Sequence, residues 1–442
     1  MCLSGALPIM GLTFCHPLFV AIMPTRFVPS SRRCFRLAPL ALSLVLGCAV
    51  LPGASWAQKA APAPAATQAA DTAAAPAEST TEGVSTLSSI PVPALGVKAW
   101  LTLDANSGQI IAAQNPKQAV EPASLTKLMS AYVIFEALES GRLKLDQMVH
   151  VSEKAWKTEG SRMFINPNTE VSVDDLLQGV LVQSGNDATV ALAEAVAGSE
   201  SAFVALMNQQ AKALGMAHTH FVNSTGLPDP DHMTTVEDLA TLARALVQQY
   251  PQYRHYDSQK EFTYNKIKQS NRNRLLWADA TVDGMKTGHT QSAGYCLVAT
   301  AMRDGRRVVS VLVGAASDAA RTESSLKLLN WSFKNFDTVK LLDKTKPAVS
   351  ARVWEGATET ADLGVEHSLW VTVPRGQADN IKTEARYTQP LMAPLTEGDK
   401  AGTLLVSLDG KTLRQVPLTV MKSVPQAGFF GRLIDKIRLL FQ

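Results

Sequence analysis

The segment 121–130, Glu-Pro-Ala-Ser-Leu-Thr-Lys-Leu-Met-Ser, constrains the fold more than any other stretch of this 442-residue chain. It predicts a turn that runs directly into a helix, because Pro122 fits the first helical turn, where its missing N–H costs nothing. Apolar side chains then recur near helical spacing, at Leu128, Tyr132, Phe135 and Leu138. We therefore expect one face of this helix to be buried.

Ser124 and Lys127 lie three residues apart near the start of the predicted helix, so the hydroxyl and the amine point the same way. A serine beside an amine is one of the few arrangements that activate an oxygen nucleophile without histidine. The same spacing recurs at Ser324 and Lys327, and a polar pair near a helix start explains either copy equally well. Residues further along the chain must decide between them.

Two further short motifs follow the first copy and not the second. Ser184-Gly185-Asn186 lies in a predicted turn between helices, and Lys286-Thr287-Gly288 lies at the end of a predicted strand. Alone, the former is explained by a helix cap and the latter by a solvated turn. In order on a helix, a loop and a strand, the three motifs instead predict an acyl-transfer site.

Acyl transfer needs a nucleophile, a base, an acid for the leaving amine and an oxyanion site. Ser124 is expected to attack. Lys127 is the expected base, provided that burial and a second cation, with Lys286 as the candidate, hold its amine neutral. The hydroxyl of Ser184 can relay a proton to the leaving nitrogen, and Asn186 can hold either a substrate amide or the Lys127 side chain.

The strand that carries Lys286, Thr287 and Gly288 is expected to bind the substrate. Gly288 lets an extended peptide approach the strand edge closely, as an added strand would. The backbone N–H groups of Ser124 and His289 are the expected oxyanion donors. The predicted site therefore combines a helix start, a loop and a strand end.

Composition excludes several other classes of function. The formal net charge is +3 with 18% charged residues, and no basic stripe is interleaved with aromatic residues, so we expect no nucleic-acid partner. Four of the five cysteines lie in the first fifty residues, which leaves only Cys296 in the rest of the chain. We therefore expect neither a disulfide framework nor a cysteine-rich metal site, and the predicted chemistry uses no metal or cofactor.

Residues 1–57 have the pattern of an export signal. A basic region at 32–36 precedes an apolar run at 40–50, and small residues precede a cleavage point after Ala57. Translation is expected to begin at Met23, because the residues before it are apolar and uncharged, unlike the start of a signal.

The route of export stays open between ordinary secretion and a twin-arginine signal at Arg32-Arg33. Cys48 is disfavoured as a lipoprotein acceptor, because the residues before it fit poorly. Residues 58–92 are rich in Ala, Pro, Thr and Ser and are expected to form a disordered linker.

The pattern over 93–337 predicts one α+β domain. A hairpin at 97–113 comes first, helical patterns dominate 173–248, strands lie between 282 and 313, and a helix closes the domain at 325–336. The sum is an antiparallel sheet flanked by helices, with a helical insertion. Residues 338–424 show only strand and turn patterns, which predicts a small separate all-β domain.

The last segment, 425–442, is predicted to contain an amphipathic helix. Residues 429, 430, 433, 434, 437, 440 and 441 make one apolar stripe, opposite Arg432, Lys436 and Arg438. The terminal position, the phenylalanines and the cations favour a membrane surface over docking on the protein itself, and the helix is too charged to span a bilayer. We expect residues 429–441 to bind the inner-membrane surface.

The three motifs and their intervals resemble those of the penicillin-recognising serine enzymes. The longer stretches 121–129, 182–188 and 282–290 resemble the low-molecular-mass D-alanyl-D-alanine carboxypeptidases in particular. This resemblance covers about 93–440. It implies a β-lactamase/transpeptidase-like domain, a β-rich C-terminal domain and removal of the terminal D-alanine from peptidoglycan pentapeptide stems through an acyl-serine. It also implies acylation by β-lactam antibiotics.

Two arginines carry over from the resemblance. Arg272 lies in Asn-Arg-Asn, which matches a stretch near the family's active site, and Arg321 follows Lys-Thr-Gly at about the position of a family arginine. Either can attract the free carboxylate of the substrate, and a solvated surface charge is the alternative for Arg321. Residues 223–226 lack a histidine that some members carry, so no role of that histidine is expected here.

Together these features predict an exported, periplasmic serine D-alanyl-D-alanine carboxypeptidase at the outer face of the inner membrane. A β-lactamase of the same fold is disfavoured, because no acidic deacylating loop is found and Gly185 stands where such enzymes usually carry Asp. A D,D-endopeptidase is disfavoured by the C-terminal domain and tail helix. A non-catalytic wall-binding protein is disfavoured by three intact motifs.

Overall fold

The computed structural model describes residues 84–85, 87 and 90–441. The predicted export signal, 1–57, lies outside the described residues, as does most of the predicted linker, 58–92. Val84–Ser85 forms strand β1, which pairs antiparallel with β3 (Ile110–Gln114). These two residues fall within the predicted linker, and their backbone pairs with what would otherwise be an open sheet edge.

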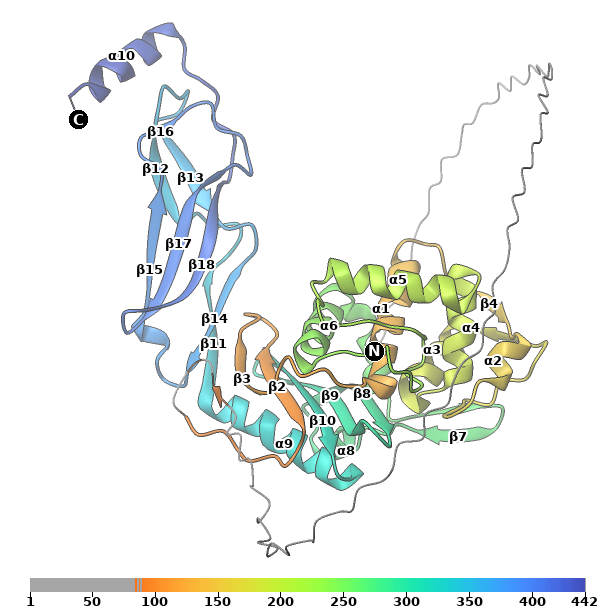
Figure 1. Ribbon diagram of the computed structural model, residues 1–442. Helices are drawn as coiled ribbons and strands as arrows, with labels where there is room; N and C mark the ends of the chain where they lie inside the picture. The colour runs from red at the N-terminus through yellow and green to blue at the C-terminus, as the bar shows by residue number, and fades with distance from the viewer. Residues whose placement is uncertain (1–83, 86, 88–89, 442) are drawn as a thin grey trace, which may run out of the picture. The chain divides into compact units, whose positions relative to one another are not determined.

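A six-stranded antiparallel sheet forms the centre of the first domain, in the order β1-β3-β2-β10-β9-β8 (Figure 1). Its remaining strands are β2 (Ala99–Asp104), β8 (Val282–Thr290), β9 (Gly294–Arg303) and β10 (Arg306–Ala315). Apolar side chains of β9 and β10 are buried on both faces of the sheet, as expected for central strands. Among the strands that the structure describes, β8 lies at the end of this sheet and pairs only with β9.

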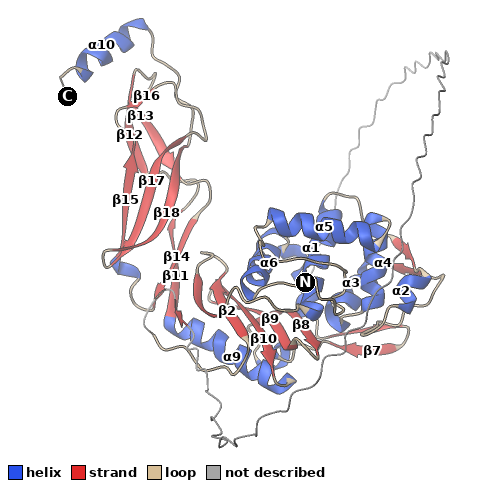
Figure 2. Cartoon of the chain, in the orientation of Figure 1, coloured by secondary structure: helices blue, strands red, loops and turns tan. Residues whose placement is uncertain are grey.

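Helices cover both faces of this sheet (Figure 2). On one face α9 (Asp318–Asn335) packs its Leu328 against Trp100 and Leu312. On the other face lie α1 (Lys127–Glu139) and α6 (Val236–Gln249), within the largest apolar core. α9 begins seven residues before the predicted start at 325, because Ser317 caps it by accepting a hydrogen bond from Ala320 N at 3.1 Å.

The segment between β3 and β8 forms the predicted helical insertion. Its helical elements are η1 (Ala123–Thr126), α1, α2 (Glu153–Lys157), α3 (Val173–Gln178), the π-helical turn η2 (Gly179–Gln183), α4 (Asn186–Ala197), α5 (Glu200–Ala213), α6, η3 (Pro251–Tyr253), α7 (Arg254–Ser258) and α8 (Leu275–Ala278). Two small hairpins join them, β4 (Met148–His150) with β5 (Glu170–Ser172), and β6 (Glu261–Tyr264) with β7 (Ile267–Ser270).

After α9 the chain is made almost wholly of strands. β11 (Phe336–Leu342) pairs with β14 (Leu369–Pro374), and a second six-stranded sheet has the order β15-β17-β18-β13-β12-β16. Its strands are β12 (Val349–Trp354), β13 (Thr360–Gly364), β15 (Ile381–Tyr387), β16 (Leu391–Met392), β17 (Lys400–Leu408) and β18 (Lys411–Val420), with the turn η4 (Ala378–Asn380) before β15. These strands enclose their own apolar core.

The chain ends in the helix α10 (Phe429–Leu439), as the apolar stripe predicts. Within the described residues, no single helix is long and apolar enough to cross a membrane. Only α4 and α5 together meet the length and composition required, and they are bent by 83° with respect to each other.

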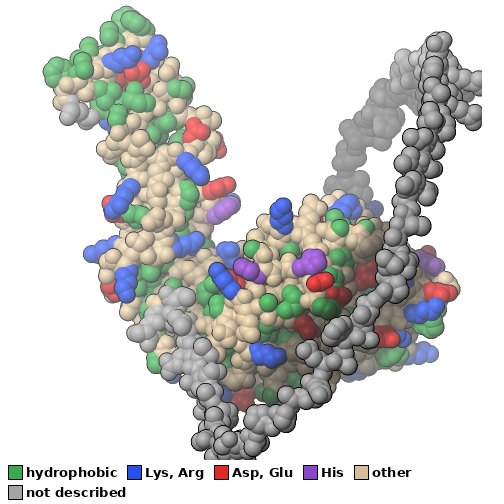
Figure 3. Space-filling view, in the orientation of Figure 1, with side chains coloured by type: hydrophobic (Ala, Val, Ile, Leu, Met, Phe, Trp, Pro, Cys, Tyr) green, Lys and Arg blue, Asp and Glu red, His purple; other side chains and the backbone are tan. Residues whose placement is uncertain are grey.

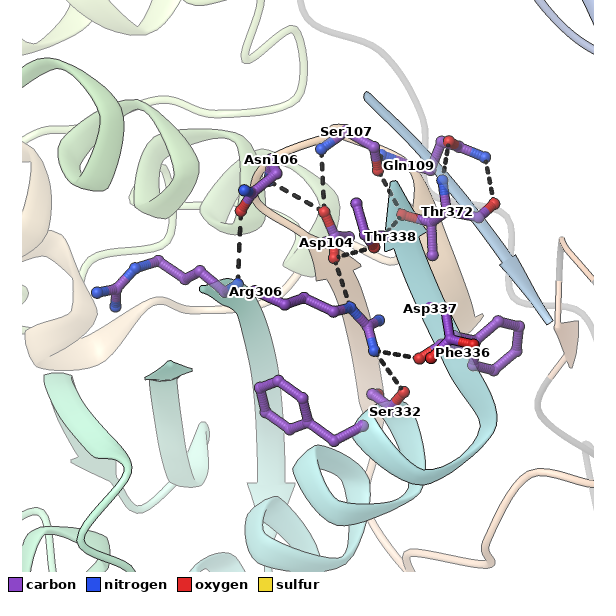
Figure 4. Close-up of polar contacts among 12 residues, drawn as sticks. Asp104, Asn106, Ser107, Gln109, Arg306, Ser332, Phe336, Asp337, Thr338 and Thr372 are labelled. Atoms are coloured by element: carbon purple, nitrogen blue, oxygen red, sulfur yellow. Dashed lines mark hydrogen bonds and ion pairs between the residues drawn. The ribbon is translucent and has the colours of Figure 1, made fainter. Parts of the chain in front are cut away.

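Buried Asp104, at the end of β2, ties the β2–β3 turn to the strands that follow α9 (Figure 4). Its carboxylate accepts hydrogen bonds from the backbone of Asn106 (3.0 Å) and Ser107 (2.9 Å), from Nε of Arg306 (2.8 Å) and from Oγ1 of Thr338 (2.6 Å). The hydroxyl of Ser107 also lies 2.6 Å from that of Thr372 in β14. A fully paired carboxylate therefore holds this turn in place.

Candidate active site

The turn that carries Ser124 is tightly constrained. Ala123 has a positive φ of 47°, and its carbonyl accepts a 2.8 Å hydrogen bond from Oγ1 of Thr126. Gly226, with a φ of +86°, lies against the other side, where an added Cβ would come within 1.8 Å of the same carbonyl oxygen. Such strained backbone persists only where the surroundings hold it, and it concentrates at functional sites.

His232 supports this turn through a contact with Thr126 and was not identified from the sequence. Its Nε2 lies 2.8 Å from Oγ1 of Thr126, and its Nδ1 accepts a 3.1 Å hydrogen bond from Val222 N. Burial lowers the pKa of His232 to about 4, so the ring is neutral and its proton lies on Nε2. His232 therefore positions the turn through Thr126.

Lys127 is fully buried and connects two of the three motifs. Its Nζ lies 3.1 Å from Oγ of Ser124, 2.6 Å from Oδ1 of Asn186 and 2.6 Å from the carbonyl oxygen of Thr225. A neutral amine has two N–H groups and one lone pair. Because the amide and carbonyl oxygens can only accept, they take both N–H groups, and the lone pair is left facing the Ser124 hydroxyl.

The surroundings of Lys127 favour this neutral form. Burial, and then the nearby charge of Arg272, lower the pKa of Lys127 to about 7, against a smaller opposing effect of Asp187. The sequence had suggested Lys286 as the cation responsible. Burial and repulsion by Lys127 do hold the pKa of Lys286 well below its usual value, so the two ammonium groups destabilise each other, but Arg272 is the cation that acts on Lys127 most strongly.

The second motif lies where η2 meets α4. Ser184 ends η2 in a left-handed conformation (φ 67°), and its buried Oγ has no hydrogen-bond partner among the described residues. Asn186, in the first turn of α4, donates through Nδ2 to the Glu159 carbonyl at 2.6 Å. The next residue, Asp187, holds the 163–165 loop by accepting hydrogen bonds from three backbone N–H groups.

The third motif lies on β8, at the edge of the sheet and beside η1. Lys286 and Thr287 are buried, whereas His289 is exposed and stacks on Tyr295 with ring centroids 4.1 Å apart. A Cβ on Gly288 would lie 3.1–3.2 Å from Pro122 O and Ser124 N, so the glycine lets β8 approach the nucleophile turn closely. The free edge of β8 is available to pair with an extended chain.

A cavity of about 730 Å³ brings most of these residues together. Seven of the predicted site residues line it: Ser124, Ser184, Arg272, Thr287, Gly288, His289 and Arg321. The other three, Lys127, Asn186 and Lys286, are buried, and Lys127 reaches the cavity through its contact with Ser124. Ser324, from the second copy of the serine–lysine spacing, is buried on α9, where its hydroxyl donates to Leu95 O at 3.1 Å.

The two arginines differ in their surroundings. Arg321 is buried, not solvated: it pairs with Asp318, lies over the Tyr295 ring at 5.6 Å, and leaves its Nε without a partner among the described residues. Arg272 lines the same cavity and has no ion-pair partner in the described part of the chain. Both cations are therefore placed to attract an anion into the cavity.

Several lining residues were missed from the sequence. They are Ser161, Ser270, Asn271, Arg274, Trp277, Tyr295 and Asp318. Asp318, three residues before Arg321 on a helix, is the one whose spacing carries a usable signal. Among the described residues, no group of three or more His, Cys, Asp or Glu side chains is placed to hold a metal ion.

Two family models match this chain. Residues 86–317 match the model of D-alanyl-D-alanine carboxypeptidase, and residues 336–426 match that of the C-terminal domain of penicillin-binding protein 5. The two matched segments contain the sheet with its helical insertion and the strand-rich part that follows.

Curated and solved proteins agree with these matches. The chain is 44% identical over 360 residues to the D-alanyl-D-alanine carboxypeptidase DacC of Escherichia coli K12, with 80% of this chain and 90% of that protein covered. It is 40% identical over 358 residues to DacA of the same strain, covering 79% and 89%. The crystal structure of penicillin binding protein 5 from Haemophilus influenzae matches with a TM-score of 0.74 and 40% identity, over 76% of this chain and all of that one. The fold class predicted from the sequence is thereby confirmed.

Proposed function

The chain belongs to the D-alanyl-D-alanine carboxypeptidase family, serine hydrolases among the low-molecular-mass penicillin-binding proteins, and from this premise we propose that it works through an acyl-enzyme on Ser124. Lys127 is the proposed general base. The proposed substrate is the peptidoglycan pentapeptide stem, from which the terminal D-alanine is released.

One observation carries this proposal more than any other. Both N–H groups of a neutral Lys127 are taken by Asn186 and Thr225, so its lone pair faces the Ser124 hydroxyl at 3.1 Å. With a pKa of about 7, a substantial fraction of Lys127 is neutral at neutral pH. A general base needs both this geometry and a pKa near the working pH.

In the proposed acylation, Oγ of Ser124 attacks the carbonyl carbon of the penultimate D-alanine while its proton passes to Nζ of Lys127. The negative charge that forms on the carbonyl oxygen is stabilised by the backbone N–H groups of Ser124 and His289. The C–N bond to the terminal D-alanine then breaks. Ser184 relays this proton from Lys127 to the leaving nitrogen, a role for which its buried hydroxyl, unpaired among the described residues, is suited.

Deacylation completes the proposed cycle. Water attacks the ester carbonyl, its proton passes to Lys127, and Oγ of Ser124 leaves and regains a proton. The lysine thus returns to its neutral form after each half-reaction. No other group in the described residues combines contact with Ser124 and a pKa near neutrality.

The substrate backbone is proposed to lie along the edge of β8, beside Thr287 and Gly288. The buried side chains of Asn186 and Lys286 are proposed to support this substrate site. The terminal carboxylate of the substrate is proposed to bind Arg321, Arg272 or both, because these cations line the same cavity as Ser124.

Penicillins are proposed to acylate the same serine. A strained lactam carbonyl offers Ser124 the same electrophile, and ring opening leaves the amine attached to the adduct instead of releasing it. Water must then remove the whole group, so the proposed penicilloyl-enzyme is inhibited for as long as it lasts.

Mass spectrometry of the protein after penicillin treatment tests the proposed nucleophile. We expect a mass increase of one penicillin, located on the peptide that contains Ser124, and no increase for Ser124→Ala. An adduct on another serine, or release of D-alanine by Ser124→Ala at the native rate, would refute the assignment. Parallel digests of monomeric and cross-linked muropeptides test the reaction class, since an endopeptidase would cleave the latter.

We also propose that the protein is exported by residues 1–57, lies in the periplasm, and attaches to the outer face of the inner membrane through 429–441. The support comes from α10, whose large apolar side chains are exposed (Figure 3). Phe429, Phe430 and Phe441 are 68%, 77% and 86% exposed. Such a face, with cations beside it, is suited to an anionic lipid surface.

A further inference from the structure

Another cavity, of about 420 Å³, lies against the β2–β3 turn. From the first domain it is lined by Asn106, Ser107 and Arg244 of α6. The strand-rich domain contributes Lys400 at the start of β17, Arg414 of β18, and residues 366–369, which lead into β14. The site described above uses none of these residues.

Two arginines, Arg244 and Arg414, line this cavity. Nε of Arg244 donates to the Ala105 carbonyl at 3.0 Å, and NH1 of Arg414 donates to the carbonyls of Ser107 (2.9 Å) and Trp370 (3.0 Å). These acceptors are neutral and hold the guanidinium groups in place without balancing their charge. A guanidinium has five N–H donors, so most of the donors of each arginine remain for another partner.

The positive charge in the cavity is not neutralised locally. In the part of the chain that the structure describes, neither arginine forms an ion pair, and burial lowers the pKa of both, with Arg414 also repelling Arg244. The carboxylate of Asp104 opposes this lowering of the pKa of Arg244, but Asp104 is already paired with Arg306. Glu366 lines the cavity but is exposed, as is His367.

We propose that this cavity binds an oxyanion, either a carboxylate or a phosphate group, between Arg244, Arg414 and Lys400. Planar guanidinium forks match both groups in geometry and charge. A bound oxyanion would neutralise the two arginines and fill donor positions that the protein leaves open. Because its ligands come from both domains, the ion would also strengthen the contact between them.

Calorimetric titration of the purified protein tests the proposal in two arms, one with inorganic phosphate and one with succinate, at an ionic strength held constant with sodium chloride. We expect saturation at one ion per chain in at least one arm, and the arm that saturates identifies the chemical group. Arg414→Gln should weaken binding about tenfold or more, as expected for a charge-assisted hydrogen bond.

Two further variants separate binding from folding. Lys400→Gln removes an exposed side chain that has no hydrogen bond or ion pair among the described residues, and should weaken binding about two- to fivefold without unfolding the protein. Arg386→Gln, on exposed β15, is the charge-matched control and should leave binding unchanged. The proposal is overturned if neither ion saturates, or if Arg414→Gln and Lys400→Gln bind as the unaltered protein does, which would locate the ion elsewhere.

Discussion

Oδ1 of Asn186 lies 2.6 Å from Nζ of Lys127, and this contact joins the second motif of the sequence to the first. The amide cannot rotate freely, because its Nδ2 donates to the Glu159 carbonyl at 2.6 Å. Gly160 leaves the necessary room, since a Cβ there would lie 2.6 Å from Nδ2. Asn186 thus presents an oxygen to Lys127, and this directs the lysine's lone pair to Ser124.

We expect Asn186→Asp to slow D-alanine release at neutral pH by about tenfold or more, because a carboxylate beside Nζ favours the ammonium form and raises the pKa of Lys127 above about 7. The base acts only when neutral, so the rising limb of the pH–rate profile should move to higher pH and activity should recover in alkaline buffer. Initial rates on a pentapeptide across the pH range measure this shift.

The matched control is Asn166→Asp, which adds the same charge to an exposed loop residue. Its profile should overlay that of the unaltered enzyme. A profile for Asn186→Asp that falls in height without moving along the pH axis would count against Lys127 as the titrating base.

Arg272→Gln should have two separable effects. Removal of this cation takes away a repulsion that lowers the pKa of Lys127, so the rising limb should again move to higher pH. KM should also rise, because the carboxylate of the substrate loses a partner in the cavity. Measurement of kcat and KM across pH distinguishes the two.

Arg272→Lys is the informative comparison. This substitution keeps the positive charge, so the rising limb of the pH–rate profile should stay near its position in the unaltered enzyme. The loss of the planar guanidinium group should still raise KM. If both variants left KM unchanged, Arg272 would act on Lys127 alone and substrate binding would rest on Arg321.

The structure brings together Ser124, Lys127 and Ser184, the three residues that the sequence proposes as catalytic. They were identifiable from the sequence because few other residues perform their proposed roles, and their motifs are short and local. The conformation of Ala123 was not predictable, since alanine rarely adopts the positive φ that the turn requires. That φ is imposed by Gly226 and Thr126, which approach from the side and depend on the tertiary fold.

The charged groups that act on Lys127 were predicted less well. Lys286 was the expected cation beside Lys127, whereas Arg272, from the loop after β7, has the larger effect on its pKa. Patterns of apolar residues place helices and strands, but they do not give the distances between charges on different elements. The same reason explains why His232 was not recognised as a positioning residue.

Asp104→Ala should destabilise the fold by about 3–5 kcal/mol, because it leaves Arg306, whose side chain is only 10% exposed, without its counter-charge. It also frees the backbone N–H groups of Asn106 and Ser107 (Figure 4). Urea denaturation followed by circular dichroism measures the change. Glu384→Ala, which removes the exposed pair with Arg386, is the control and should leave the transition in place. Equal effects of the two substitutions would mean that the Asp104 network adds nothing to stability.

The proposed attachment through α10 predicts a loss of membrane binding from a single substitution. Phe430→Glu places a charge among the exposed apolar side chains of α10, where 77% of Phe430 is accessible. Transfer of a phenylalanine into lipid is worth about 1.5–3 kcal/mol, so binding to anionic lipid vesicles in a co-sedimentation assay should fall about tenfold or more.

Leu145→Glu, which changes an exposed apolar residue outside α10, is the matched control and should bind as the unaltered protein does. Equal sedimentation of Phe430→Glu would exclude α10 as the anchor. Retained catalysis by that variant in solution would then separate the role of the helix from that of the active site, because α10 contributes no residue to the cavity around Ser124.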